Sequence, residues 1–104
     1  MEKVVTNENI KEVLASAPVV LVDFWAVWCG PCRALGPVIE EVASEFEGKI
    51  VVGKCNVDEA QDISMEYGIR SIPTVIFFKN GEPVDKTVGL VPKEEIVKRI
   101  NNLL

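Results

Sequence analysis

The sequence predicts an α/β fold in which a central mixed β-sheet carries helices on both faces. The run 19–26 is apolar except for Asp23, which is typical of a strand buried on both sides, and 50–57 is predicted as a second buried strand. A stretch of helical periodicity, 31–46, lies between them, and two parallel strands need such a crossover helix. The pair Asn80-Gly81 then predicts a hairpin, which adds an antiparallel strand to the sheet.

The first two elements follow from apolar spacing and from residues that begin or end helices. A helix is predicted at 7–17, with Thr6 or Asn7 as its N-cap and Pro18 directly after its end. The strand 19–26 comes next, and Asp23 is the one charged residue in it.

The central helix is predicted at 31–46. Pro31 suits the first turn, where its missing N–H is not needed, and Gly48 supplies the stop. Pro37 lies inside the helix and removes a backbone bond to Arg33, so a kink is expected there. The apolar stripe of this helix consists of Leu35, Val38, Ile39, Val42, Ala43 and Phe46.

The second half of the chain completes the sheet. The strand 50–57 precedes a short helix at 60–67, which Gly68 ends. A strand at 74–79 and a returning antiparallel strand at 84–88 flank the hairpin turn. A last helix begins at Pro92. Its core-facing residues are expected to be Ile96, Val97, Ile100, Leu103 and Leu104.

Composition and charge exclude several classes of function. The 104 residues suit a single domain, 1–104, and 16 acids against 11 bases give a net charge of −5. That balance argues against binding to nucleic acid or to anionic membranes, which need a basic face. No apolar run approaches the roughly 20 residues that span a bilayer, and the first residues contain no signal-peptide core. A cytoplasmic protein is therefore expected.

The motif that carries chemistry is Cys29-Gly30-Pro31-Cys32, placed where a strand ends and a helix begins. A bare C-x-x-C motif serves either redox chemistry or metal binding. Structural zinc normally takes four Cys or His ligands, whereas this chain has three cysteines and no histidine. No metal site is expected, and any chemistry must use thiols, carboxylates, lysines and the backbone.

The position of the motif predicts unequal roles for its two sulfurs. A thiolate attacks disulfides, and a helix N-terminus favours the thiolate by about 0.3–2 kcal/mol. Cys29 lies at the expected N-cap and is the predicted nucleophile. Cys32, one turn further in and more buried, is expected to resolve the mixed disulfide. Gly30 and Pro31 add no cation that would stabilise the reduced form, so the dithiol is expected to act as a reductant.

The sequence resembles the thioredoxin family over nearly its whole length. The segment Val22 to Ala26, the motif Trp28 to Cys32, Pro37, the segment Ile72 to Thr74, the segment Phe78 to Gly81, and Gly89 match the family's landmarks. The resemblance implies the thioredoxin fold and a general protein disulfide reductase that is recycled by a thioredoxin reductase. It implies disulfide-containing protein substrates, no bound cofactor and a monomer.

Two charged residues are expected to support the thiols. Burial in the strand should raise the pKa of Asp23, which would then accept a proton from Cys32, directly or through water. The alternative is an acid at the strand end that faces solvent. The resemblance places Lys54 beside Asp23, where its charge would moderate that rise; an exposed strand lysine is the alternative.

The resemblance also assigns a substrate groove. It implies a cis bond between Ile72 and Pro73, with Ser71 and Ile72 as one wall that pairs with an extended substrate. Trp28 is expected to cover the site and touch substrate, although tryptophan is more often a core residue. Gly89 either permits close approach of the backbone near the thiols or is a plain turn glycine.

Three further residues leave questions open. Cys55 lies in an apolar strand and is expected to be a buried small side chain rather than a regulatory or dimer-forming thiol. Val27 stands where many family members carry a polar residue, and Arg33 replaces a frequent lysine.

Two rival functions remain: a disulfide oxidant or isomerase in an oxidising compartment, and a non-catalytic binding module that uses the groove as a contact surface.

Overall fold

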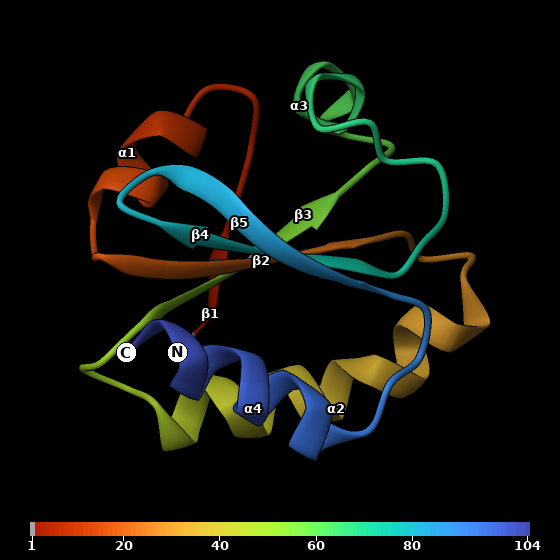
Figure 1. Ribbon diagram of the computed structural model, residues 1–104. Helices are drawn as coiled ribbons and strands as arrows, with labels where there is room; N and C mark the ends of the chain where they lie inside the picture. The colour runs from red at the N-terminus through yellow and green to blue at the C-terminus, as the bar shows by residue number, and fades with distance from the viewer. Residues whose placement is uncertain (1) are drawn as a thin grey trace.

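The computed structural model describes residues 2–104, and in these residues a five-stranded sheet lies between two layers of helices (Figure 1). Helices α1 and α3 cover one face of the sheet, and α2 and α4 cover the other. The elements in chain order are β1 (Glu2–Val4), α1 (Ile10–Ala15), β2 (Val19–Trp25), α2 (Gly30–Glu45), β3 (Val51–Asn56), α3 (Gln61–Glu66), β4 (Thr74–Lys79), β5 (Glu82–Val88) and α4 (Lys93–Leu103).

The sheet is mixed, as predicted, with the strand order β1-β3-β2-β4-β5. The first three strands of that order run parallel, and β4 is antiparallel to both β2 and β5. The hairpin turn has the expected conformation, because Asn80 and Gly81 both have positive φ angles, 52° and 84°. The central position of β2 explains why all its residues but Trp25 are buried.

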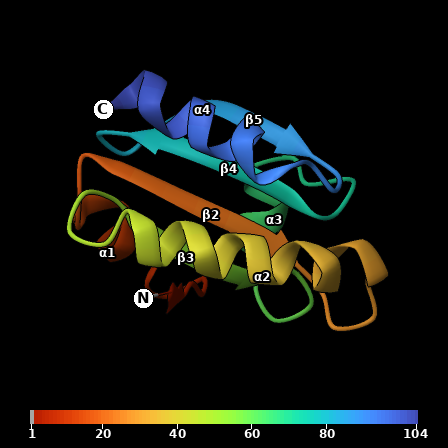
Figure 2. The ribbon, with the colours of Figure 1, turned by 90° about the horizontal axis from the view of Figure 1, so that it is seen from below.

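Alternating residues of β2 divide the core into two layers. Val20, Val22 and Phe24 pack with α1 and α3, together with Phe78 of β4. Val19 and Leu21 point to the opposite face and pack with α2 and α4. Asp23 continues this second series, so its carboxyl group lies on the face that α2 covers. Seen from that side, α2 lies over β2 and β3, and α4 lies over β4 and β5 (Figure 2).

One strand was missed, and two expectations about the helices were wrong. The strand β1 was not predicted, because it has three residues and an exposed, polar composition at the edge of the sheet. The N-cap of α1 is Asn9 rather than Thr6 or Asn7; Thr6 and Asn9 instead exchange hydrogen bonds from backbone N–H to side-chain oxygen, over 2.8 and 3.1 Å. Leu104 follows the last helix and is 57% exposed, so it does not face the core.

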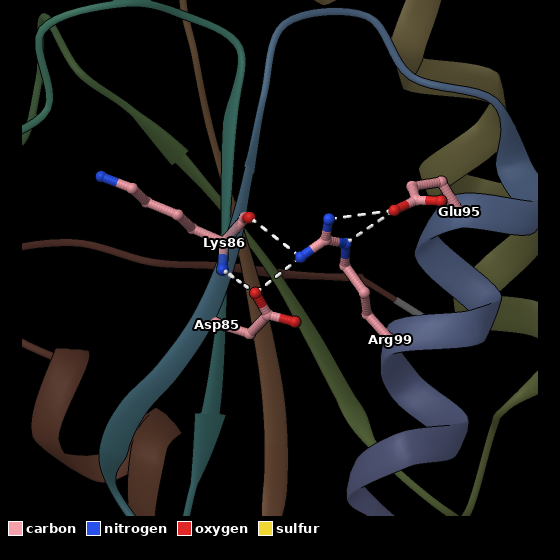
Figure 3. Close-up of polar contacts among 4 residues, drawn as sticks. All are labelled: Asp85, Lys86, Glu95 and Arg99. Atoms are coloured by element: carbon pink, nitrogen blue, oxygen red, sulfur yellow. Dashed lines mark hydrogen bonds and ion pairs between the residues drawn. The ribbon is translucent and has the colours of Figure 1, made fainter.

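Cationic side chains hold α4 against its neighbours. Arg99 of α4 donates to Asp85 over 2.6 Å and to the Lys86 carbonyl over 3.3 Å, which joins the helix to β5 (Figure 3). It also donates to Glu95 of the same helix over 2.9 Å. Lys93 bridges from the start of α4 to two acids of α2, which are Glu41 and Glu45. The last helix is thus tied to both the sheet and its neighbouring helix.

Candidate active site

The two cysteines of the motif form a disulfide at the start of α2. Cys29 is the N-cap of this helix, with extended backbone angles, and its sulfur accepts the backbone N–H of Cys32 over 3.2 Å. Pro31 lies in the first turn, as predicted, and Gly30 is exposed with open space around it. An unpaired N–H of a helix start is therefore directed at the Cys29 sulfur, which is the arrangement that favours an anion.

The two sulfurs differ less in burial than the sequence predicts. Cys29 is 5% exposed and Cys32 is 3% exposed. What distinguishes them is the helix: the Cys29 side chain lies at its open N-terminal end, whereas Cys32 lies inside the first turn. The asymmetry of the pair is therefore one of hydrogen bonding more than of access.

The segment before β4 forms the wall opposite the disulfide. The Ile72–Pro73 bond is cis, as the resemblance implied, and the Ile72 carbonyl oxygen lies 3.8 Å from the Cys29 sulfur. Ile72 is partly buried and packs with the two cysteines. Ser71 is exposed at the edge of this wall, where its carbonyl accepts the Thr74 hydroxyl over 2.6 Å.

Asp23 lies in the central strand β2, on the sheet face that α2 covers, and is 1% exposed. Neither of its carboxylate oxygens has a hydrogen-bond partner among the described residues. Burial raises the pKa of this carboxyl group to about 7, while the charge of Lys54 opposes the rise. The solvent-facing alternative for Asp23 is excluded, and the expected direction of its pKa is confirmed.

Lys54 is paired with Asp23 in the register of β2 and β3, so the two side chains share one face of the sheet. Its ammonium group lies 5.0 Å from the centre of the Trp25 ring. It also lies 4.0 Å from the position that a Cβ on Gly36 of α2 would occupy. The lysine is half-buried between the sheet and α2, beside Asp23, and not an exposed strand residue.

Trp28 is 66% exposed, so it is a surface residue of the site rather than a core residue. Its indole nitrogen donates a hydrogen bond to Asp58 over 2.8 Å. The backbone N–H of Asp58 is in turn bound by the Asn56 side chain over 2.9 Å. This link ties the loop that bears Trp28 to the residues that follow β3.

Gly89 has a φ angle of 87°, a conformation that L side chains rarely adopt. Apart from the glycine and its two chain neighbours, no atom of residues 2–104 lies within 4 Å of the place where its Cβ would be. The positive φ angle alone favours glycine at this turn, as the turn interpretation expects. Its N–H donates to the Pro73 carbonyl over 2.7 Å and so links β5 to the wall of the site.

The remaining candidates lie at and behind the rim. Cys55 is a free thiol that is fully buried, and burial together with the charge of Asp23 raises its pKa to about 11. This confirms its interpretation as a buried small side chain. Val27 is 61% exposed, and its carbonyl accepts a hydrogen bond from the Arg33 guanidinium over 2.9 Å.

Comparison with known proteins places this geometry in a family. The family model described as Thioredoxin matches residues 1–102. Thioredoxin of Chlorobaculum thiosulfatiphilum is 54% identical over 97 residues, which cover 92% of this chain and 90% of that protein. The chain belongs to the thioredoxin family.

Other relatives and a solved structure agree with this assignment to the thioredoxin family. Thioredoxin M-type, chloroplastic, of Spinacia oleracea is 52% identical over 101 residues, 96% of this chain and 56% of that protein. A point mutant of thioredoxin from Halobacterium salinarum NRC-1 superposes with a TM-score of 0.91 at 36% identity, covering 98% of this chain and 89% of the other. The thioredoxin fold expected from the sequence is confirmed.

Membership of the thioredoxin family and the disulfide-forming pair make this chain a protein disulfide oxidoreductase. Its substrates are proteins with disulfides, and a reductase returns the oxidised pair to the dithiol, as is general for thioredoxins. Within residues 2–104, no helix has both the length and the apolar character needed to cross a membrane.

Sequence reasoning missed three residues around the site, which are Glu2, Asn56 and Asp58. Asn56 and Asp58 lie at the carboxyl end of β3, next to the end of β2 that carries the thiols, and polar residues at such ends of parallel strands often line a site. That signal is visible in the sequence. Glu2 had no comparable signal, because its strand was not predicted.

Proposed function

We propose that this protein is a general dithiol reductant of protein disulfides, with Cys29 as the nucleophile and Cys32 as the resolving thiol. The observation that carries the proposal is the hydrogen bond from the Cys32 N–H to the Cys29 sulfur at the start of α2. The same bond and the helix dipole stabilise a thiolate on Cys29 once the disulfide is reduced. Among residues 2–104, no side chain or helix-start N–H is seen to donate to the Cys32 sulfur.

The reaction has two exchange steps. The Cys29 thiolate attacks one sulfur of the substrate disulfide, and the other substrate sulfur leaves as a thiolate that takes a proton from water. Cys32 then passes its proton to the Asp23 carboxylate, directly or through water. The Cys32 thiolate attacks the Cys29 sulfur, which breaks the mixed disulfide, and the second substrate sulfur leaves and is protonated.

We propose that Asp23 accepts and returns the proton of Cys32 and that Lys54 stabilises the Asp23 carboxylate. A carboxyl group with a pKa of about 7 is divided between its two forms near neutral pH, so it both accepts and returns protons there. Lys54 lies on the adjacent strand and opposes the cost of burying the carboxylate. Without that cation the carboxyl group would stay protonated to higher pH.

The substrate is proposed to bind across the wall opposite the disulfide. The main chain around Ile72 would pair with an extended segment of the substrate, while Ser71 and Pro73 border that segment. Trp28 and the turn at Gly89 flank the groove on its two sides. The exposed Trp28 ring supplies apolar contact area at low cost in conformational entropy, because Asp58 already holds it.

The neutral linker of Gly30 and Pro31 supports the reducing direction. It places no cation beside the thiolate, so the disulfide stays comparatively favoured and the dithiol gives electrons away. We propose that the chain works as a monomeric single domain in the cytoplasm, where thiols are kept reduced, and that a thioredoxin reductase recycles it.

Reduction of insulin, followed by precipitation of its free B chain, tests the proposal. The wild type should be active, and Cys29→Ser should lose activity. Cys32→Ser should instead accumulate a mixed disulfide with the substrate through Cys29. Loss of the mixed disulfide in Cys29→Ser with its persistence in Cys32→Ser would establish the two roles.

Two results would favour the rival functions. A wild type without thiol-dependent activity would indicate a binding module. A dithiol that stays reduced in a mildly oxidising glutathione buffer would indicate an oxidant or isomerase, because its disulfide would then be the less stable form.

A further inference from the structure

Glu2 brings a second carboxylate to the sheet face that carries Asp23 and Lys54. It lies on β1 and pairs with Val52 of β3, whose side chain belongs to the core beneath α2. Glu2 also lines a cavity of about 190 Å³ together with residues of α2, including Glu40 and Ala43. Both observations place the Glu2 side chain between the sheet and α2.

Lys54 occupies the strand between these two carboxylates. On one side the register pairs it with Asp23 of β2, and on the other it pairs with Val4 of β1, two positions after Glu2. Residues two positions apart on a strand point to the same face, so Glu2 is a diagonal neighbour of Lys54. One ammonium group is therefore flanked by two acids on the same face.

The charge of Lys54 stabilises the ionised form of the Glu2 carboxyl group. Its Oε2 atom is buried and has no hydrogen-bond partner among the described residues. Burial and the charge of Glu40 both raise the pKa of Glu2, whereas Lys54 lowers it. The same lysine lowers the pKa of Asp23, and the charge of Glu2 raises it. The charge of Glu2 thus disfavours the ionised form of Asp23, and the charge of Lys54 stabilises both carboxylates.

We propose that Glu2 is a positioning residue of the redox site, which competes with Asp23 for the ammonium group of Lys54 and so sets how readily Asp23 accepts the proton of Cys32. The inference rests on the proposed role of Asp23 as that acceptor.

The charged and titratable groups around Asp23 are few among residues 2–104. Lys54 faces it from β3, Glu2 acts from β1, Cys32 lies on α2, and Cys55 of β3 couples to it. On β4, the residue paired with Asp23 is the apolar Val75. Glu2 is thus the group whose removal frees Lys54 for Asp23 without touching the thiols.

The test is to measure the pKa of Asp23 directly, by carbon NMR of its carboxyl group, in the wild type and in Glu2→Gln. Freed from competition, Lys54 should stabilise the Asp23 carboxylate and lower its pKa by about 0.5, a small part of the change that direct ion pairs cause. At pH 6 that is about a two- to threefold larger fraction of carboxylate. The pH profile of the resolving step should move to lower pH by the same amount.

Two variants serve as controls. Glu2→Asp keeps the charge and should leave the pKa of Asp23 closer to that of the wild type than Glu2→Gln does. Glu12→Gln removes an exposed acid of α1, on the opposite face of the sheet, and should leave it unchanged. An equal change in Glu2→Gln and Glu12→Gln would indicate a mere effect of net charge and would overturn the inference.

Failure of the inference and failure of the proposed function give different results. An unchanged Asp23 pKa in Glu2→Gln, in a protein that still reduces insulin, would show that Glu2 does not act on Asp23. If the pKa moves but Asp23→Asn has the same pH profile as the wild type, the proposed role of Asp23 is wrong, and Glu2 no longer positions a catalytic group.

Discussion

The Trp28 indole donates a hydrogen bond to the Asp58 carboxylate over 2.8 Å, and this bond joins the loop before the disulfide to the end of β3. The ring itself is two-thirds exposed, so the bond orders a large apolar surface without burying it. A substrate that contacts this ring meets it already in place. We therefore expect the bond to support the proposed binding of substrate at Trp28 rather than the chemistry of the sulfurs.

Removing this acceptor should weaken the binding of protein substrates. We expect Asp58→Ala to lower kcat/KM for insulin reduction about fivefold, mainly through KM, because a hydrogen bond to an exposed charged group contributes about 1 kcal/mol. Asp58→Asn keeps an acceptor oxygen and should retain most of the activity. Glu59→Gln removes the adjacent exposed acid as a control. Equal losses in all three variants would refute a specific role for the bond.

Replacing the buried acid should stabilise the fold at alkaline pH. Because the pKa of Asp23 is raised from 3.8 to about 7, the folded state binds this proton more tightly than the unfolded state does. The resulting cost to stability is absent below about pH 4, grows as the pH rises, and is complete above about pH 7, where it reaches up to about 4 kcal/mol.

The measurement for Asp23→Asn is urea unfolding of the oxidised protein. The variant should be more stable than the wild type by a few kcal/mol at pH 8, and the difference should shrink towards zero near pH 4. The same variant should resolve mixed disulfides more slowly. Glu8→Gln, an exposed change of the same charge, should show no such pH-dependent gain. A pH-independent difference for Asp23→Asn would contradict the raised pKa.

The ion pairs of Arg99 should contribute modestly to the docking of α4. We expect Arg99→Met to lower the free energy of unfolding by about 0.5–1 kcal/mol, since the pairs with Asp85 and Glu95 are partly exposed. The loss should shrink in high salt. Lys98→Met, at the exposed neighbouring position, is the matched control, and urea unfolding in low and high salt is the measurement.

Cys55 should be inert in the folded protein. It is fully buried and its pKa is raised to about 11, so little thiolate forms and none is accessible. Mass spectrometry after treatment with iodoacetamide at pH 8 should find Cys55 unmodified in the native oxidised protein and modified in urea. Cys55→Ala should retain disulfide reduction. Rapid labelling of the native thiol, or dimers linked through it, would restore the regulatory interpretation.

The sequence predicted those parts of the fold in which local pattern and burial agree. The apolar run of β2 and the Asn80-Gly81 turn each have one strong interpretation, and the structure confirms both. The strand β1 escaped prediction because an edge strand of three residues owes its existence to pairing with β3, a distant partner, and not to its own composition.

The residues of the site also differ in whether a local sequence pattern reveals them. Cys29 and Cys32 were found from their spacing alone, and the position of Asp23 was found because a charge in a buried strand is unusual. The partners of these residues were harder to find. The contact of Trp28 with Asp58 joins positions 30 apart in the sequence, and the place of Glu2 beside Lys54 depends on a strand register. Neither leaves a local pattern.

The proximity of the Ile72 carbonyl to the Cys29 sulfur also bears on the folding kinetics of this chain. The two residues are 43 positions apart, and they meet where the antiparallel β2 and β4 come together. Contacts between such distant segments are costly to close and form late in the folding of small domains. The Ile72 wall therefore forms beside the Cys29 sulfur only after β2 and β4 have paired. A nascent or half-folded chain thus carries the cysteine pair without the proposed substrate groove.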